Sequence, residues 1–268
     1  MAAQIAFFIV AAALLLIHTH AEAAPGFSYS GDTGPGNWGS LNRNFTACSA
    51  GKAQSPIDIV KKKAVLSKSF KPLNRKYHPV NATLVNHGYN VGLQFGNAGE
   101  LFLNGKNYTL QQMHWHTPSE HKFDGASSDA GLHLVHKASD GSISVVAILY
   151  KIGRADPIIA QIQGNLAQLA REKRAPRYGD IQIPVGTFDA RKLRRRLRHY
   201  YRYVGSLTTP PCSEKVIWHV SGEVRSISKE QVEILRAPLQ STCKSNCRPV
   251  QPLNGRRVEL FDSQSIVN

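Results

Sequence analysis

The stretch Gln111–His136 constrains this chain more than any other part, because it places five of the eleven histidines within two segments of strand-like alternation. In a β-strand, residues i and i+2 lie on the same face, so His114 and His116 are expected to point the same way. Leu132–His136 has the pattern of a second strand, and pairing it beside the first would bring His133 to the same point. Three neutral imidazoles leave one tetrahedral position open, which is typical of a catalytic zinc site.

The same alternation sorts the neighbouring side chains. Gln112 falls on the histidine side of the first strand. His136 is out of phase with His133, and His121 follows a proline in a loop, so neither is expected to bind the metal. The candidate metal ligands are therefore His114, His116 and His133.

The first residues have the features of a secretory signal peptide. Ile5–Ile17 is apolar but short for a membrane span, and Ala21-Glu22-Ala23 offers a cleavage site with small residues. The predicted division is a signal peptide over residues 1–23 and one domain over residues 24–268. The alternative is an uncleaved anchor, because no Lys or Arg precedes the apolar run. We expect a secreted protein whose mature chain has no transmembrane segment.

Four cysteines remain in the mature chain, and an oxidising compartment would allow two disulfides in any of three pairings. They are Cys48, Cys212, Cys243 and Cys247. Three Asn-x-Ser/Thr sequons agree with secretion and are candidate glycosylation sites, at Asn44, Asn81 and Asn107.

The chain is strongly basic, with 33 Lys and Arg against 18 Asp and Glu. Removal of residues 1–23 takes away one acidic residue and no basic one, which raises the net charge from +15 to +16. Such an excess favours polyanions, and acidic polysaccharides or anionic surfaces fit a secreted protein better than nucleic acid does. The tract 191–202 concentrates this charge; the alternative is a solvated turn that binds nothing specific. Its candidate contacts are Arg191, Lys192, Arg194, Arg195, Arg196 and Arg198.

Short segments rich in β-branched and aromatic residues, separated by turn residues, fill most of the chain. Val91–Phe95 and Leu101–Leu103 are examples, and Asn104-Gly105 predicts a hairpin. Ile143–Tyr150 is nearly all apolar, as in a central strand buried on both faces. Many short strands, few helices and no βαβ rhythm predict a mainly β (α+β) single domain.

Two helices are predicted. Asp156-Pro157 begins the longer one, with Asp as N-cap, an apolar face and closure at residues 171–174. Ser228–Gln231 is a capping box that opens a shorter helix. Residues 24–55 are rich in Gly, Ser, Asn and Pro and are expected to be extended and irregular. The G-x-G-x-x-G match at Gly34–Gly39 has no strand before it and no helix after it, which excludes a dinucleotide loop.

Three segments, in this order, resemble the α-class carbonic anhydrases. They are Gln112–His121 (QMHWHTPSEH), Leu132–His136 (LHLVH) and Gly205–Cys212 (GSLTTPPC). The likeness also includes Gln54–Asp58 and extends from about Phe27 to Leu260. The signal peptide and the sequons resemble those of secreted members, including plant members.

The resemblance implies a fold and a reaction. The fold is a large twisted, mostly antiparallel central sheet with a few peripheral helices, and one zinc ion bound by the three histidines in a cleft. Zinc on neutral imidazoles lowers the pKa of bound water to about 7, an effect for which carbonic anhydrase is itself the standard example. The implied activity is the reversible hydration of carbon dioxide to bicarbonate and a proton by zinc-bound hydroxide.

The resemblance also assigns roles to other side chains. Thr208 would accept a hydrogen bond from the hydroxide and donate one to Glu120, which orients the hydroxide. Thr209 would line the substrate site. Cys48 and Cys212 would form a disulfide that holds the Thr208 loop. An apolar wall for carbon dioxide would comprise Val135, Val145, Leu207 and Trp218, although plain core packing would give the same pattern.

Two positions depart from the family's pattern. Gly131 stands where an acidic residue usually supports the third ligand, so weaker zinc binding is expected, with a water or a backbone carbonyl in the vacated place. Gln112 keeps the support of the first ligand. Tyr89 stands where fast members have a histidine that carries protons, and tyrosine titrates too high for that task. His87 is either a substitute or an ordinary loop histidine, so we expect slower, buffer-dependent turnover.

These departures leave a second function open. The alternative is a storage, defence or wall-binding protein on the same scaffold, with weak or no turnover. The presence of Glu120 and Thr208 favours catalysis, because a structural protein does not need the relay. Esterase activity would be incidental. The expected location is extracellular, the apoplast for a plant protein, or alternatively a plastid reached through the secretory route.

Overall fold

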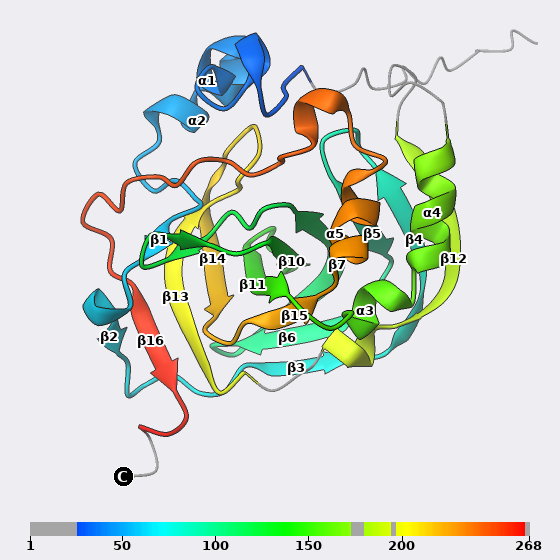
Figure 1. Cartoon of the computed structure of the whole chain (residues 1–268). Helices are drawn as coiled ribbons and strands as arrows, with labels where there is room; N and C mark the ends of the chain where they lie inside the picture. Colours follow the sequence, from blue (N-terminus) through cyan, green and yellow to red (C-terminus); the bar gives the residue numbers. More distant parts are fainter. Residues whose placement is uncertain (1–25, 173–179, 194–196, 266–268) are drawn as a thin grey trace, which may run out of the picture.

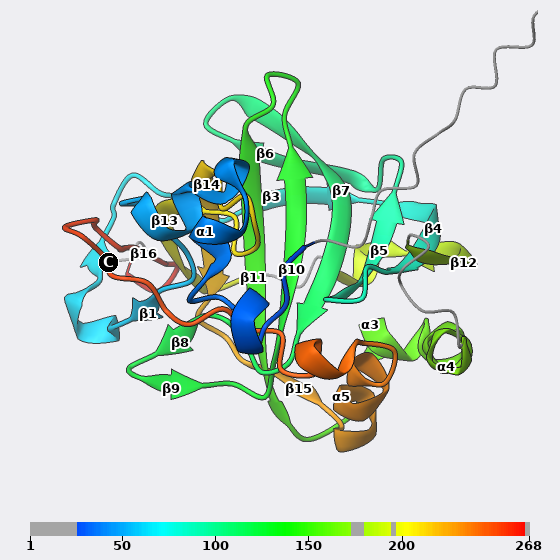
Figure 2. The same ribbon diagram turned by 90° about the horizontal axis from the view of Figure 1, so that it is seen from above.

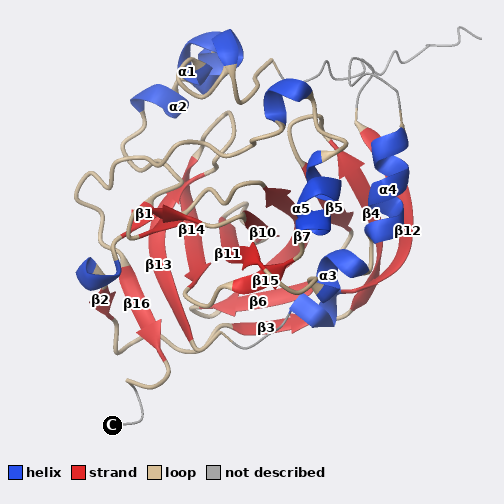
Figure 3. Ribbon diagram, viewed as in Figure 1, coloured by secondary structure: helices blue, strands red, loops and turns tan. Residues whose placement is uncertain are grey.

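The computed structural model of this chain describes residues 26–172, 180–193 and 197–265. The predicted signal peptide and residues 194–196 of the basic tract lie outside these ranges. Figure 1 shows a wide, twisted sheet that curves through the molecule, with the helices at its periphery. Figure 3 shows the same predominance of strands by colour. The mainly β, single-domain fold class is confirmed.

The elements have the following bounds. The strands are β1 (Asp58–Ile59), β2 (Val65–Leu66), β3 (Asn74–Tyr77), β4 (Pro79–Asn86), β5 (Val91–Phe95), β6 (Gly99–Leu103), β7 (Lys106–His116), β8 (Lys122–Phe123), β9 (Ala126–Ser127), β10 (Ala130–Lys137), β11 (Ile143–Ile152), β12 (Ile181–Asp189), β13 (His199–Ser206), β14 (Glu214–Ser221), β15 (Arg225–Ile227) and β16 (Glu259–Asp262). The helices are α1 (Trp38–Leu41), α2 (Ala47–Ala50), α3 (Pro157–Ala160), α4 (Gln163–Arg171) and α5 (Lys229–Arg236).

Thirteen of these strands form one sheet. Its main path runs in the order β12, β4, β5, β7, β10, β11, β14, β13, β16, β2, while β6 joins β7 to β3 and β15 pairs with β11. Most neighbours are antiparallel, as the resemblance implied. The parallel pairs are β11 with β14, β11 with β15, and β16 with β2, so the sheet is mixed. A second, three-stranded sheet contains β1, β8 and β9.

The strands that carry the candidate site lie in the middle of the large sheet. Figure 2 shows β7, β10 and β11 side by side across the centre of the molecule. β11 is buried from Ser144 to Tyr150, which confirms a central strand covered on both faces. The hairpin between β6 and β7 is also confirmed. Asn104 and Gly105 both have positive φ, 51° and 78°, which a two-residue type I′ turn requires.

The predicted long helix is instead two short ones. Asp156 Oδ1 caps α3 by accepting hydrogen bonds from the N–H groups of Ile158 and Ile159. The N–H groups of Gln161 and Ile162 then bond to carbonyls three residues back, which tightens the chain and ends α3 before α4 begins. The apolar face is nevertheless buried on both pieces, because each packs separately on the core. The buried residues of that face are Ile158, Ile162, Leu166 and Leu169.

The end of that helix also differs from the prediction. α4 ends at Arg171, and residues 173 and 174 of the predicted closing tract lie outside the described ranges. The capping box at Ser228 is present and opens α5, as predicted.

The lead-in segment is not extended, contrary to the expectation from its composition. It forms α1, α2 and two 3-10 turns at Gly31–Thr33 and Arg43–Phe45. The reason is Trp38, which is fully buried and donates its indole N–H to the carbonyls of Ser28 and Thr33. A small core of its own therefore organises the segment.

Candidate metal centre and its cleft

Three histidines converge in the middle of the sheet. β7 and β10 pair antiparallel, with His133 opposite His114 and Gly131 opposite His116. One ring nitrogen from each of the three histidines lies within 4.8 Å of the others. Among the described residues, this is the one cluster of three or more His, Cys, Asp or Glu side chains with such spacing. The register of β7 and β10 thus brings the three histidines together, as their alternation in the sequence predicted.

Hydrogen bonds orient two of the three rings. His114 Nδ1 lies 2.8 Å from Gln112 Oε1, on the same face of β7. His116 donates from Nδ1 to the main-chain carbonyl of Asn246 over 2.5 Å. Because a carbonyl oxygen only accepts, this bond leaves Nε2 of His116 as the free nitrogen.

The donor set fits a zinc ion. His116 Nε2 is fully buried and has no hydrogen-bond partner, which is costly unless a further group satisfies it. Burial lowers the pKa of His114 and of His133, with smaller contributions from neighbouring histidines. Both rings therefore stay neutral, the form that binds a metal.

A pocket of about 200 Å³ opens beside the triad. Gly92 lies at its side, where a Cβ would be 2.7 Å from the Met113 carbonyl, so glycine lets β5 approach β7 closely. Val135 pairs with Val145, and Val145 pairs with Trp218, so the three lie side by side on adjacent strands. The predicted residues that line the pocket are His87, Tyr89, Gln112, Val135, Val145, Leu207, Thr208, Thr209 and Trp218.

Glu120 is buried next to the triad. Its Oε2 lies 3.5 Å from His116 Nε2 and 3.9 Å from His133 Nδ1. Its Oε1 accepts the main-chain N–H of Arg248 at 3.0 Å. Burial raises the pKa of Glu120, while His116, Thr208 and Arg248 act in the opposite direction. The carboxylate is thus held in place with one oxygen free to face Thr208.

The disulfide implied by the resemblance is present. Cys48 and Cys212 are bonded, with their Cα atoms 5.0 Å apart. Cys212 also donates its N–H to the carbonyl of Thr209, which closes the turn that directly follows Thr208. Cys243 and Cys247 are both free thiols in this structure.

The position of Gly131 does not require a glycine. Its φ is not positive, and a Cβ there would make an ordinary 3.4 Å contact with Ser119. Nearby, His121 is buried and its Nε2 lies 2.7 Å from the Tyr203 hydroxyl, while its Nδ1 has no hydrogen-bond partner. The rings of His121 and His133 are 5.9 Å apart. The Nδ1 atom of His121, whose ring lies close to the third ligand, therefore lacks a polar partner.

His87 and Tyr89 lie together at the pocket. Their rings stack with centroids 5.6 Å apart, and His87 Nδ1 is 2.7 Å from a carboxylate oxygen of Asp180. Burial raises the pKa of Tyr89 to about 12. Tyr89 thus remains protonated at physiological pH.

Three residues of this site were not identified from the sequence. Asn246 contacts His116 from 130 positions away, and Arg248 contacts Glu120 from 128 positions away. Asp180, which contacts His87, precedes the edge strand β12. No local pattern marks these residues, because their partners lie on distant parts of the chain.

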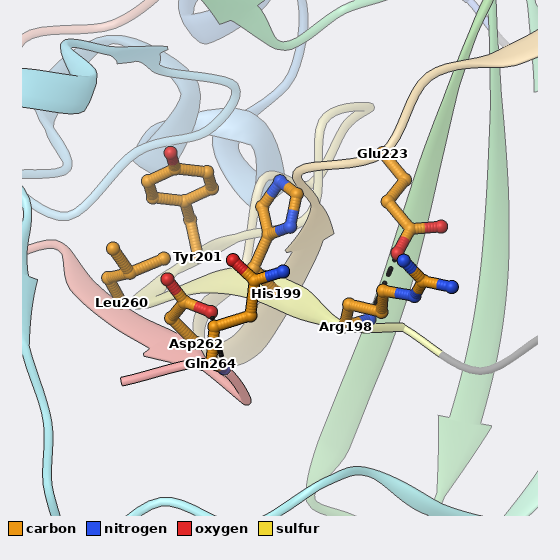
Figure 4. Close-up of a pocket in the computed structure, with 7 residues that line it drawn as sticks. All are labelled: Arg198, His199, Tyr201, Glu223, Leu260, Asp262 and Gln264. Carbon is orange, nitrogen blue, oxygen red and sulfur yellow. Dashed lines mark hydrogen bonds between the residues drawn. The ribbon is translucent and has the colours of Figure 1, made fainter. Parts of the chain in front are cut away.

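The described residues of the basic tract 191–202 lie near acidic residues, and the three sequon asparagines lie at the surface. Arg191 pairs with Asp189 at 2.8 Å. Arg198 lies in a separate pocket of about 740 Å³ with Glu223 and Asp262, and its main-chain N–H donates to Glu223 Oε1 at 3.1 Å (Figure 4). Binding of a polyanion to this tract stays a prediction. The three sequon asparagines are all exposed, and their glycosylation also stays a prediction.

No helix in the described ranges is both long and apolar enough to cross a bilayer.

The fold and the histidine cluster together define a candidate three-histidine metal site in the middle of a mixed β-sheet. A family model for the eukaryotic-type carbonic anhydrases matches residues 33–261. The chain therefore belongs to the α carbonic anhydrase family.

Individual relatives agree with this assignment. Alpha carbonic anhydrase 7 of Arabidopsis thaliana is 40% identical over 91% of this chain and 88% of the relative. Dioscorin dioA3 of Dioscorea japonica is 36% identical over 88% of this chain and 86% of the relative. A crystal structure of dioscorin complexed with ascorbate superposes with a TM-score of 0.84, at 36% identity, over 88% of this chain and 98% of the other.

An enzyme structure is similarly close. The complex of α-carbonic anhydrase from Thermovibrio ammonificans with the inhibitor sulfanilamide has a TM-score of 0.77 and 36% identity, covering 87% of this chain and 98% of the other. Similarity thus extends both to carbonic anhydrases and to dioscorins.

Proposed function

We propose that this chain reversibly hydrates carbon dioxide to bicarbonate and a proton, with one zinc ion bound by His114, His116 and His133. The observation that carries the proposal is the convergence of three histidine ring nitrogens beside an apolar-walled pocket that contains Thr208. The similarity to named carbonic anhydrases, one of them in complex with sulfanilamide, supports it.

Thr208 and Glu120 would orient the attacking group. When bound, zinc supplies a coordinated water whose pKa is lowered to about 7. Because Arg248 occupies Oε1 of Glu120, its Oε2 is the acceptor left for the Thr208 hydroxyl. With its proton directed there, Thr208 can only accept a hydrogen bond from the nucleophile, which fixes the direction of attack.

The pocket wall suits a small apolar substrate. Val135, Val145 and Trp218 form an adjacent row across three strands, and Leu207 completes it from the Thr208 loop. Carbon dioxide has no net dipole, so it loses little on leaving water for such a wall. Bicarbonate is charged and is held less well there, which favours its release.

The test combines zinc content with a sulfonamide-inhibitable assay of carbon dioxide hydration. We expect stoichiometric zinc and activity. Thr208→Val should retain zinc and lower kcat/KM on the order of 100-fold, because it keeps the shape and removes the hydroxyl. Stoichiometric zinc without hydration would reject the enzymatic function.

The second candidate is a storage, defence or wall-binding protein with weak or no turnover. The similarity to dioscorin in its solved structure, at the same 36% identity as the Thermovibrio ammonificans enzyme, supports this candidate. Gly131, Tyr89 and the net charge of +15 point the same way. Zinc-loaded protein that binds cell-wall polysaccharide but shows no hydration would support it.

We also propose that the chain is secreted after cleavage of residues 1–23. The physical basis is the apolar run at Ile5–Ile17 and the disulfide Cys48–Cys212, which persists in oxidising compartments. N-terminal sequencing of the protein recovered from the extracellular fluid would test it. A mature chain that begins at Met1 would contradict it.

A further inference from the structure

Cys243 and Cys247 are the two free thiols of the chain, and they enclose the segment that contacts the histidine triad. Cys243 is fully buried at the end of the 3-10 turn Ser241–Cys243, and Cys247 is partly exposed. Only Lys244, Ser245 and Asn246 separate them. A bond between the two sulfurs would therefore close a small ring that contains Asn246.

Asn246 is the most connected residue of this segment. Its main-chain carbonyl accepts from His116 Nδ1, and its side-chain Oδ1 accepts from the N–H of Thr117 at 2.8 Å. Its Nδ2 donates to the carbonyls of Tyr89 and Trp115. A shift of this one residue would thus alter the hydrogen bond that sets the tautomer of a zinc ligand.

The residues on either side extend this connection. Lys244 donates from Nζ to the carbonyls of Arg236 and Ala237, at the C-terminus of α5. Arg248 follows Cys247 directly and donates its N–H to Glu120. The segment therefore links a helix end to both His116 and Glu120.

Tyr29 contacts this segment next to Cys243, because its main-chain N–H donates to the carbonyl of Thr242 at 3.3 Å. Burial raises the pKa of Tyr29 well above its usual value, and Glu120, Tyr89 and the two thiols add to the increase. The Tyr29 hydroxyl has no hydrogen-bond partner. The N-terminal segment thus packs against the residues beside Cys243.

We propose that Cys243 and Cys247 are a reversible disulfide site whose closure weakens the contact of Asn246 with His116. In the exchange, Cys247 sulfur attacks a small disulfide such as oxidised glutathione and expels one glutathione thiol. Cys243 sulfur then attacks the mixed disulfide at Cys247 and expels the second. The protein loses two thiol hydrogens and two electrons, and one glutathione disulfide becomes two thiols. The effect on zinc rests on the proposed metal site.

Exchange at this site should be slow, so the measurement is made at equilibrium. Burial raises the pKa of both thiols, which lowers their thiolate fraction. The zinc-loaded full chain is incubated in glutathione buffers of increasing oxidation, and its remaining thiols are alkylated and counted by mass spectrometry. Zinc transfer to a chromophoric chelator is then timed.

We expect both thiols to disappear together and zinc release to become faster by on the order of tenfold, the usual size of a lost ligand partner. Cys243→Ser and Cys247→Ser are matched controls that keep size and polarity, and their zinc release should not respond to oxidation. Glutathione adducts without a protein disulfide, or a disulfide with unchanged zinc release, would overturn the proposal.

A second measurement separates this proposal from the proposed function. The NMR signals of the His116 ring in metal-free protein report its bond to Asn246 directly. They should shift on oxidation in the parent chain and stay fixed in Cys243→Ser. A chain that binds zinc without hydrating carbon dioxide would still show these changes, and unchanged signals would reject the disulfide effect alone.

Discussion

Gly131 is a glycine at a position beside the metal site where a larger side chain would fit. The backbone there does not need glycine, and the space next to Ser119 accepts a Cβ at an ordinary contact distance. His121 Nδ1 is left buried without a partner, which is a destabilising feature in itself. Because residue 131 has no side chain, it supplies no hydrogen-bond acceptor behind the third histidine, His133.

Gly131→Glu should strengthen zinc binding. Residue 131 lies on the same face of β10 as His133, so a carboxylate there can accept from that ring and from His121. We expect slower zinc release, on the order of tenfold, measured by transfer to a chelator. Gly131→Ala is the control, since it adds a Cβ and no acceptor. Equal release from the two variants would contradict this explanation.

His87 is the residue best placed to export protons from the pocket. It lines the cleft, and Asp180 holds its ring at 2.7 Å. His87→Ala should lower kcat on the order of tenfold at low buffer and leave kcat/KM unchanged, because proton export follows the attack on carbon dioxide. Added imidazole should restore the rate.

Asp180→Asn is the companion variant. It keeps the shape and removes the charge beside His87, so its kcat should lie between those of the parent chain and His87→Ala. A parent rate that does not depend on buffer concentration would exclude His87 from proton export.

At the scale of elements, short helices depend on their caps because few internal hydrogen bonds support them. α3 has only four residues, and Asp156 satisfies two of its first N–H groups. The same carboxylate lies 3.4 Å from Arg225, at the start of β15. One side chain therefore joins a helix start to a sheet edge.

Asp156→Ala should lower the free energy of unfolding by about 1–2 kcal/mol, the usual cost of removing an N-cap acceptor. The measurement is urea denaturation at neutral pH. Asp156→Asn keeps an oxygen acceptor and should lose clearly less stability. If both variants lose the same amount, the contact with Arg225, and not the cap, supports α3.

At the scale of the whole molecule, the sheet buries several histidines outside the triad. Burial lowers the pKa of His136 and of His219 to about 3. Tyr77 and the Ser144 carbonyl contact His136, which keeps its neutral ring in place. These rings remain uncharged in the fold, whereas in the unfolded chain they would bind protons near pH 6.5.

Stability should therefore decrease in acid. The folded-state pKa is below the unfolded value, so this stability is present above about pH 6.5 and is lost as the pH falls towards 3, at about 1.4 kcal/mol per pH unit for each ring. Urea denaturation at pH 7 and pH 5 measures the slope. His219→Asn should reduce the slope of the unfolding free energy against pH by about 1.4 kcal/mol per pH unit, because one fewer ring takes up a proton on unfolding. His78→Asn, at an exposed histidine, is the control and should leave it unchanged.

Much of the fold could be predicted because its signals are local. The two positive-φ residues Asn104 and Gly105 specify their hairpin, and the apolar run of β11 specifies a central strand. Residues 26–55 could not be predicted in the same way. Their polar composition indicates a loop, and only the burial of Trp38 against Phe27 and the disulfide makes them turn.

The sequence by itself determined which side chains could meet a metal, because a strand's period of two places His114 and His116 on one face whatever surrounds them. The sequence also determined the N-caps of α3 and α5, at Asp156 and Ser228, and the turn at Asn104-Gly105. Tertiary structure alone decided what holds His116, Glu120 and His87 in place. Asn246, Arg248 and Asp180 reach the site from distant segments, and their contacts exist only once the sheet has closed around the cleft. Hydrogen bonds between such remote residues leave no periodic trace in the chain, since their geometry depends on the packing of every strand between them.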